Sequence, residues 1–224
     1  MMTDMTMDNF LAVLSSSEPV PGGGGACGYV AAVGMSLGNM VLALTTGKKK
    51  YAEYQEEIEE LIVKATDLTK RLAECMDKDA ESFKPLAAAY GLPKDTEEQI
   101  KEREAIMAKA LVTASEAPLS MMELILEAMK LIDRISVIGS RIAISDAGVG
   151  ITMCEAAMKG ASLNVFINTK LMKDRELAED MNFKADKMLA EAAQIEEETF
   201  GRVMDAVRPV SYTHLRAHET KANL

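Results

Sequence analysis

One aspartate breaks an apolar stripe of this 224-residue chain and is the first residue whose position suggests chemistry. Leu68, Leu72 and Cys75 recur at the spacing of one buried helix face, and the series continues onto Asp79 and then Phe83. A carboxylate on such a face is costly unless it is paired or hydrogen-bonded, and its acidity is often shifted. Asp79 is therefore a candidate proton-transfer group. A buried aspartate that caps a neighbouring helix or pairs with an arginine explains the position equally well.

Three further polar residues share one face of a helix predicted over 140–169: Asp146, Asn164 and Asn168. Glycine, alanine and methionine lie between them on that face, and the small side chains leave room for a ligand or for a neighbouring backbone. The pattern indicates either a binding surface or tight helix packing in which the asparagines hydrogen-bond to backbone groups. Both interpretations stand on the sequence alone.

A glycine run and a lysine run flank the uncharged segment 20–47. Gly23 and Gly24 belong to the glycine run, where free N–H groups at the start of a helix could receive a carboxylate or phosphate. A flexible turn before the helix is the simpler interpretation. The lysines at 48–50 could bind an anion, or be solvated at the end of the helix where cations suit its dipole. Tyr51 could cover a flat ring or belong to the core.

The composition that must position these residues predicts an all-α fold. Aromatic residues make up 4% of the chain, there is no Trp, and there are 17 Met. Asp95 and Glu98 read as a capping box, and Pro118 predicts a kink or break. Short connectors between helices predict one antiparallel up-and-down helical bundle with long helices, which forms a single domain over 1–209. The expected helices cover 4–15, 50–87, 96–135, 140–169 and 174–208, and a further helix follows the glycine turn within the uncharged segment 20–47.

Charge and cysteine usage point to a cytoplasmic protein. The net charge of −10 argues against nucleic-acid or anionic-membrane partners, and three scattered cysteines suit a reducing compartment. The N-terminus lacks the basic and apolar regions of a signal peptide. The segment 20–47 is long enough to span a membrane, but its glycine and polar residues favour a buried central helix over a membrane anchor.

The last residues, 210–224, resemble the read-through translation of a sequencing adapter, and we expect them to be non-native. His214 and His218, the only histidines, lie in this tail. The domain then contains no histidine, so we expect no metal site built on histidine and no Ser-His or Cys-His nucleophile.

Taken in order, several segments resemble the cyclodeaminase/cyclohydrolase family. This is the fold of the C-terminal half of formimidoyltransferase-cyclodeaminase and of stand-alone methenyltetrahydrofolate cyclohydrolases. The combination is more specific than any one segment. The segments are Pro19-Val-Pro-Gly-Gly-Gly-Gly25, Leu44-Thr-Thr-Gly-Lys-Lys-Lys-Tyr51, Asp77-Lys-Asp-Ala80 through Phe83, Ala87 to Pro93-Lys94, Ser145-Asp-Ala-Gly148 and Gly160-Ala-Ser-Leu-Asn-Val-Phe-Ile-Asn168.

The resemblance implies a helical homodimer that binds a tetrahydrofolate derivative, with no metal. It implies hydrolysis of 5,10-methenyltetrahydrofolate to 10-formyltetrahydrofolate, which we favour because the chain lacks a transferase half. The alternative is the formimidoyltetrahydrofolate cyclodeaminase reaction, with release of ammonia. A non-catalytic dimeric bundle is the rival from another class.

The resemblance also distributes roles among the candidate residues. Asp79 and Asp146 would be catalytic, and Lys49 would act as an acid or orienting cation if burial lowers its pKa. The expected substrate-binding residues are Gly23, Gly24, Lys48, Tyr51, Arg141, Asn164 and Asn168.

Overall fold

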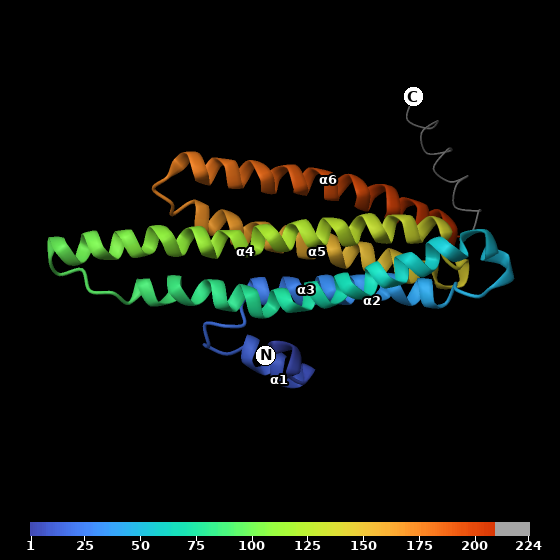
Figure 1. Ribbon diagram of the computed structural model, residues 1–224, viewed down its shortest axis with the longest axis horizontal. Helices are drawn as coiled ribbons and strands as arrows, with labels where there is room; N and C mark the ends of the chain where they lie inside the picture. Colours follow the sequence, from blue (N-terminus) through green and yellow to red (C-terminus); the bar gives the residue numbers. More distant parts are fainter. Residues whose placement is uncertain (209–224) are drawn as a thin grey trace, which may run out of the picture.

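The computed structural model describes residues 1–208 and shows an all-α protein, with no strand in that range. Consecutive long helices run in alternate directions, side by side (Figure 1). The expected tail, 210–224, lies outside the described residues. The elements are η1 (Met2–Asp4), α1 (Met7–Leu14), α2 (Gly23–Ala43), η2 (Lys49–Tyr54), α3 (Gln55–Tyr90), α4 (Glu97–Ile138), η3 (Arg141–Ala143), α5 (Ile144–Thr169) and α6 (Arg175–Val207).

Helix α2 lies against α3, α4 and α5, and Met35, Val41 and Leu42 are completely buried along it. Within residues 1–208, α2 is the one helix long and apolar enough to cross a membrane by length and composition. Its glycines allow close packing. A Cβ on Gly34 would come within 2.8 Å of the Gly150 carbonyl oxygen, and one on Gly150 within 2.7 Å of the Gly34 oxygen. The backbones of α2 and α5 therefore touch at this crossing.

Helices α3 and α4 complete a four-helix arrangement with α2 and α5. Arg134 donates to both carboxylate oxygens of Glu57 and ties the end of α4 to the start of α3. The capping box of α4 lies one residue later than expected. Thr96 accepts from the Gln99 N–H, and the Gln99 side chain accepts from the Thr96 N–H. Thr96 and Gln99 thus form the capping box that the sequence analysis expects from Asp95 and Glu98.

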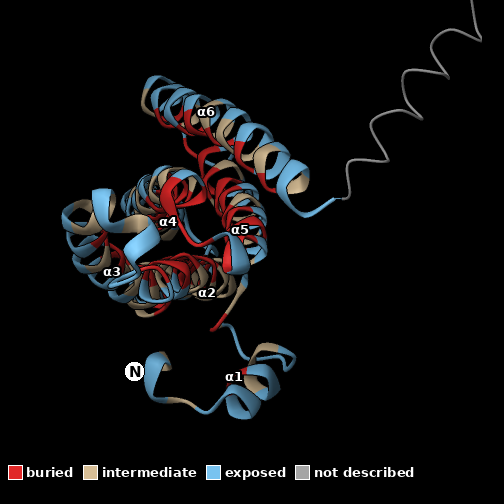
Figure 2. Cartoon of the chain, turned by 90° about the vertical axis from the view of Figure 1, so that its right-hand side faces the viewer, coloured by how far each residue is buried: buried red, intermediate tan, exposed pale blue. Residues whose placement is uncertain are grey.

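Of the kink or break expected at Pro118, the break is absent, because α4 is continuous from Glu97 to Ile138. Helix α6 packs on α4 and α5, outside the four-helix group, and its N-cap is Asp174. Seen along the bundle, α5 keeps one side free between α2 and α6 (Figure 2). Helix α1 contacts α2 through Phe10, whose ring centroid lies 5.6 Å from that of Tyr29.

Candidate functional site

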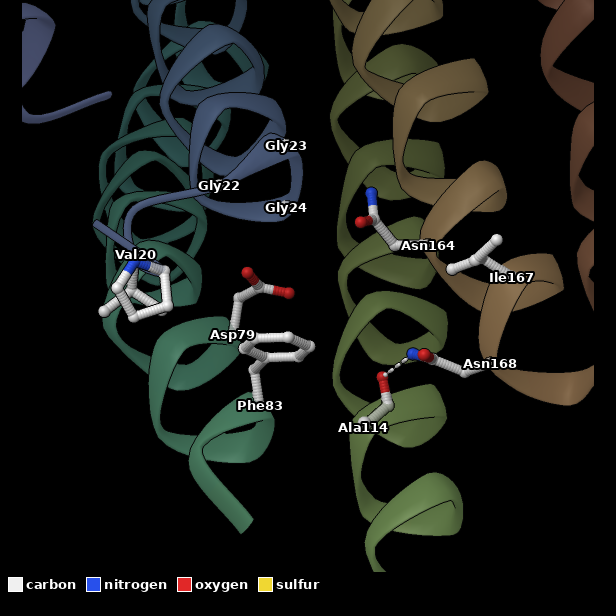
Figure 3. Close-up of a pocket in the computed structure, with 11 residues that line it drawn as sticks. Val20, Gly22, Gly23, Gly24, Asp79, Phe83, Ala114, Asn164, Ile167 and Asn168 are labelled. Atoms are coloured by element: carbon white, nitrogen blue, oxygen red, sulfur yellow. Dashed lines mark hydrogen bonds between the residues drawn. The ribbon is translucent and has the colours of Figure 1, made fainter. Parts of the chain in front are cut away.

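A pocket of about 180 Å³ lies at the start of α2, where α3, α4 and α5 also meet. The Asp79 carboxylate and the Phe83 ring point into it from α3, and Asn164 and Asn168 face them from α5 (Figure 3). Gly23 and Gly24 form part of its wall. Five of the expected site residues are therefore brought together: Gly23, Gly24, Asp79, Asn164 and Asn168.

Asp79 is held against the first turn of α2. A Cβ on Gly24 would collide with the Asp79 carboxylate, so glycine is what allows this approach. Burial raises the pKa of the Asp79 carboxyl, and the backbone N–H of Gly25 acts in the opposite direction. The carboxylate also stands at a helix start whose N-cap, Gly22, offers no side-chain oxygen. The result is a partly desolvated carboxyl group aimed at the cavity, which suits proton transfer.

The two asparagines are oriented by backbone carbonyls. Asn168 Nδ2 donates to the Ala114 oxygen over 2.8 Å. In a regular helix that oxygen would accept from residue 118, but Pro118 has no N–H, so the side chain from α5 supplies the missing donor. Asn164 Nδ2 donates to the Gly160 oxygen over 2.9 Å, four residues back on its own helix. The backbone-bonding interpretation is thus correct for both residues, and both amide oxygens remain for the pocket.

Lys48, Tyr51 and Arg141 form a second cluster at the far end of the bundle. Lys48 Nζ lies 3.3 Å from Ser140 Oγ, and the Arg141 backbone N–H donates to the Tyr51 hydroxyl over 3.2 Å. That hydrogen bond is the main reason why the pKa of Tyr51 is lowered. Lys49 is exposed, so the burial on which its role as an acid depended is absent.

Asp146 is half-buried near the start of α5 and does not line the pocket. At a rise of about 1.5 Å per residue, Asp146 and Asn164 lie roughly 27 Å apart along the helix. Sharing one face of α5 therefore did not bring them together within the chain. Among residues 1–208, no three His, Cys, Asp or Glu side chains are grouped as a metal site would need.

Apolar pocket residues were not assigned by sequence reasoning. Phe83 was noted only as the continuation of the Asp79 stripe, Val20 and Ile167 appeared only within the segments that carry the resemblance, and Ala114 was not noted. Phe83 had a signal, since it follows Asp79 by one helical turn. Ile167 had a weaker one, as an isoleucine beside Asn168.

The helical bundle and its carboxyl-amide pocket define a small-molecule site at the start of a buried helix, built from four helices of one chain. Comparison with known proteins identifies the family. The sequence model of the formiminotransferase-cyclodeaminase family matches residues 6–187, so the chain belongs to that family. The resemblance inferred from the sequence is confirmed.

The relatives include two activities. The chain is 37% identical over 202 residues to a methenyltetrahydrofolate cyclohydrolase of Methylorubrum extorquens, covering 90% of this chain and 97% of that one. It is 28% identical over 189 residues to the formimidoyltransferase-cyclodeaminase of Mus musculus, and spans 35% of that protein. A formiminotetrahydrofolate cyclodeaminase structure from Thermotoga maritima has the same fold, with a TM-score of 0.76 at 23% identity over 92% of this chain and 98% of that chain.

Proposed function

We propose that this protein hydrolyses 5,10-methenyltetrahydrofolate to 10-formyltetrahydrofolate, with Asp79 as the proton-transfer group. The observation that carries the proposal is a single desolvated carboxyl group facing two carboxamides in the pocket. The methenyl carbon of the substrate lies between two nitrogens that share a positive charge. A carboxylate beside that cation stabilises it, and the cation in turn favours the ionised form of Asp79.

The reaction needs one base and one returned proton. Water forms a bond to the methenyl carbon while Asp79 accepts a proton from it. The bond from that carbon to N5 then breaks as the new hydroxyl group loses its proton to solvent and becomes the formyl oxygen, and Asp79 returns its proton to N5. One formyl group remains on N10, and one proton is released overall. Asn164 and Asn168 would hold the pterin edge, and Phe83 would contact its ring.

Similarity favours hydrolysis over cyclodeamination. The cyclohydrolase relative is matched over nearly its full length at higher identity than the cyclodeaminase part of the mouse enzyme. Cyclodeamination remains the second candidate because it passes through the same cationic bicycle, and a carboxyl group could equally serve its proton transfers.

A spectrophotometric assay tests the assignment. The purified protein is expected to speed the loss of the methenyl chromophore in water. It should not speed the appearance of that chromophore, with ammonia release, from 5-formiminotetrahydrofolate. The opposite pattern would establish the cyclodeaminase, and the absence of both activities would leave the non-catalytic bundle.

We further propose a cytoplasmic homodimer with no nucleic-acid or membrane partner and no metal requirement. The acidic composition supports the first of these exclusions, since nucleic acids bind basic surfaces. The packing of α2 against three helices supports the second. Activity after dialysis against a chelator is the measurement for the metal.

A further inference from the structure

The N-terminal arm, residues 1–14, lies on the side of α2 that faces away from α4 and α5 (Figure 2). Phe10 is the buried residue of its helix α1, and its ring meets that of Tyr29 on α2. Phe10 does not belong to the continuous apolar core that the long helices enclose. The arm therefore covers the bundle from outside and does not fill its core.

The arm has a second attachment, on α3. The Met2 backbone N–H donates to Asp77 Oδ1 over 2.8 Å. Asp77 precedes Asp79 by two residues, and positions two apart on a helix point to different sides. Asp77 thus receives the arm on the outer side of α3, while Asp79 faces the pocket. One helical turn holds both the arm and the candidate proton-transfer group.

The same end of the arm reaches the first turn of α2. Met2 Sδ lies 3.9 Å from the position that a Cβ on Gly25 would occupy, and Pro21 Cβ lies 3.3 Å from that position. Gly25 is the residue whose backbone N–H lowers the pKa of Asp79, against the effect of burial. Met2 therefore packs against the residue that provides the backbone donor for Asp79.

Between its two attachments the arm does not fill the space against the bundle. An apolar cavity of about 260 Å³ remains there, with Met5 and Met76 among its walls. The arm is consequently held chiefly at its two attachments, to Asp77 and to Tyr29. A change at either attachment can release the arm without opening the core of the bundle.

We propose that the N-terminal arm is a strap that fixes the first turn of α2 against Asp79, and that Asp77 and Phe10 are positioning residues for the reaction. Neither residue lines the pocket, so each acts through another group. Asp77 holds Met2 against Gly25, and Phe10 holds the far end of the arm. Release of the strap frees the first turn of α2, and the Gly25 N–H then moves away from Asp79. The inference rests on the proposed function for the role of Asp79, but the contacts of the arm do not.

A pair of substitutions at Asp77 tests the strap. Asp77→Ala removes the acceptor of the Met2 N–H, whereas Asp77→Asn keeps an oxygen at that place. Both remove the same negative charge, so its effect on Asp79 is shared and only the hydrogen bond differs. Because a misplacement of about 1 Å can cost around 10²-fold in rate, kcat of Asp77→Ala should fall about ten-fold below that of Asp77→Asn, with KM nearly unchanged. Equal kcat in the two variants overturns the proposal.

The aromatic attachment provides a second pair, which keeps the test decisive should Asp77→Ala fail to fold. Phe10→Ala removes the contact with Tyr29, and Leu11→Ala, 56% exposed on the same helix, is its matched control. Phe10→Ala should lower kcat in the same way, while Leu11→Ala should keep the wild-type kcat. Circular dichroism shows whether each variant is folded. A folded Phe10→Ala with the kcat of Leu11→Ala overturns the strap.

The two attachments should not act independently. Because release at either end frees the arm, adding Asp77→Ala to Phe10→Ala should lower kcat further by much less than the effect of Asp77→Ala alone. Full multiplication of the two effects would show that each residue acts without the other, and would overturn a strap held at both ends.

A carboxyl titration tests the contact without any substrate. Carbon NMR of aspartate-labelled protein follows the Asp79 carboxyl group, and Asp79→Asn assigns its signal. Without a well-placed Gly25 N–H, the pKa of Asp79 should be higher in Asp77→Ala than in Asp77→Asn. Identical pKa values would overturn the coupling of the arm to Asp79.

The other groups around Asp79 do not disturb this comparison. Burial raises the pKa of the Cys27 thiol on α2 and of the Cys75 thiol on α3, so both are neutral where a carboxyl group titrates. The pocket residues of α4 and α5 do not titrate. A difference between the two variants therefore reports the backbone donor.

The outcomes separate the two proposals. A wild-type protein without folate activity would refute the proposed function, and the carboxyl titration would still decide whether the arm acts on Asp79. An active wild-type protein in which Asp77→Ala and Asp77→Asn agree in kcat and in the pKa of Asp79 would leave the function standing and remove the strap.

Discussion

The two ends of the bundle hold candidate residues in different ways. At the pocket end, Asp79 and Asn168 are fixed by packed helices and by backbone groups that need them. At the other end, the Lys48 and Arg141 side chains are exposed, although the buried Ser140 N–H donates to Thr45 Oγ1 over 2.8 Å and joins the two loops that carry them. The difference suggests that the pocket end performs the chemistry in a preorganised site, whereas the basic end supplies adaptable binding. Variants at the two ends should therefore fail in different ways.

The largest effect is expected for Asp79→Asn. Removal of the proton-transfer group should lower kcat by about 10²–10⁴-fold with the fold intact. Glu81→Gln, an exposed carboxylate on the same helix, is the matched control and should keep wild-type activity. Steady-state kinetics measure kcat for the two variants, and circular dichroism shows whether each is folded. A fully active, folded Asp79→Asn would remove the chemical role of the pocket end.

Gly24→Ala should displace Asp79 without removing it. The new Cβ would collide with the carboxylate, and a misplacement of about 1 Å can cost around 10²-fold in rate. Gly201→Ala on α6 is the control, because nothing lies within 4 Å of its Cβ position. That control should keep its activity and gain about 0.5–1 kcal/mol of stability. Equal kinetics for the two variants would show that the contact with Gly24 does not position Asp79.

Asn168→Ala should destabilise the fold by about 1–3 kcal/mol, because it leaves the Ala114 carbonyl without a donor. Pro118→Ala restores an N–H at the position that normally serves that oxygen. In the Pro118→Ala background, the cost of Asn168→Ala should therefore shrink. A double-mutant cycle from urea unfolding measures the coupling, and strict additivity would contradict this account of the pair.

Lys48→Gln should affect binding rather than turnover. We expect KM to rise a few-fold with kcat nearly unchanged, since an exposed charge contributes only about 0.2–1 kcal/mol. The difference from wild type should fade at high ionic strength. A loss of kcat similar to that of Asp79→Asn would end the distinction between the two ends.

The smallest effect concerns stability against pH. Burial raises the pKa of Asp79 in the folded chain above the ordinary 3.8, so the folded state holds this proton more tightly. The stabilisation of the folded state by this bound proton is complete below pH 3.8, and it is lost as the pH rises through the pKa of Asp79 in the folded chain. The Tm of Asp79→Asn minus that of wild type should therefore increase between pH 4 and pH 7. Thermal melts across this range measure the difference in Tm. A difference that stays constant with pH would mean that burial does not shift the pKa of the Asp79 carboxyl group.

Local patterns predicted the helices and singled out Asp79, which lines the pocket. The stripe that contains Asp79 locates α3 and its buried face, and the segment 20–47 was predicted to be a buried central helix, which α2 is. Capping was predicted within one residue, because Asp95 and Thr96 both suit an N-cap and only the backbone path chooses between them.

The sequence reasoning did not predict how far apart two residues lie along a helix axis. Asp146 and Asn164 share a face of α5, but a face says nothing of the distance along a helix axis. Pro118 was expected to kink or break α4, and the helix is not broken there, because a side chain from another helix replaces the lost donor. That compensation depends on tertiary contacts between residues far apart in the chain, which no local pattern records.

The bond between Asn168 and Ala114 also determines what the pocket can select. One N–H of the amide is already committed, so the group left for a ligand is chiefly its carbonyl oxygen. A ring that presents an amino or ring N–H at this place can satisfy that oxygen, whereas an analogue with only acceptors there leaves it unpaired. Discrimination between such rings would then originate in a proline on a different helix.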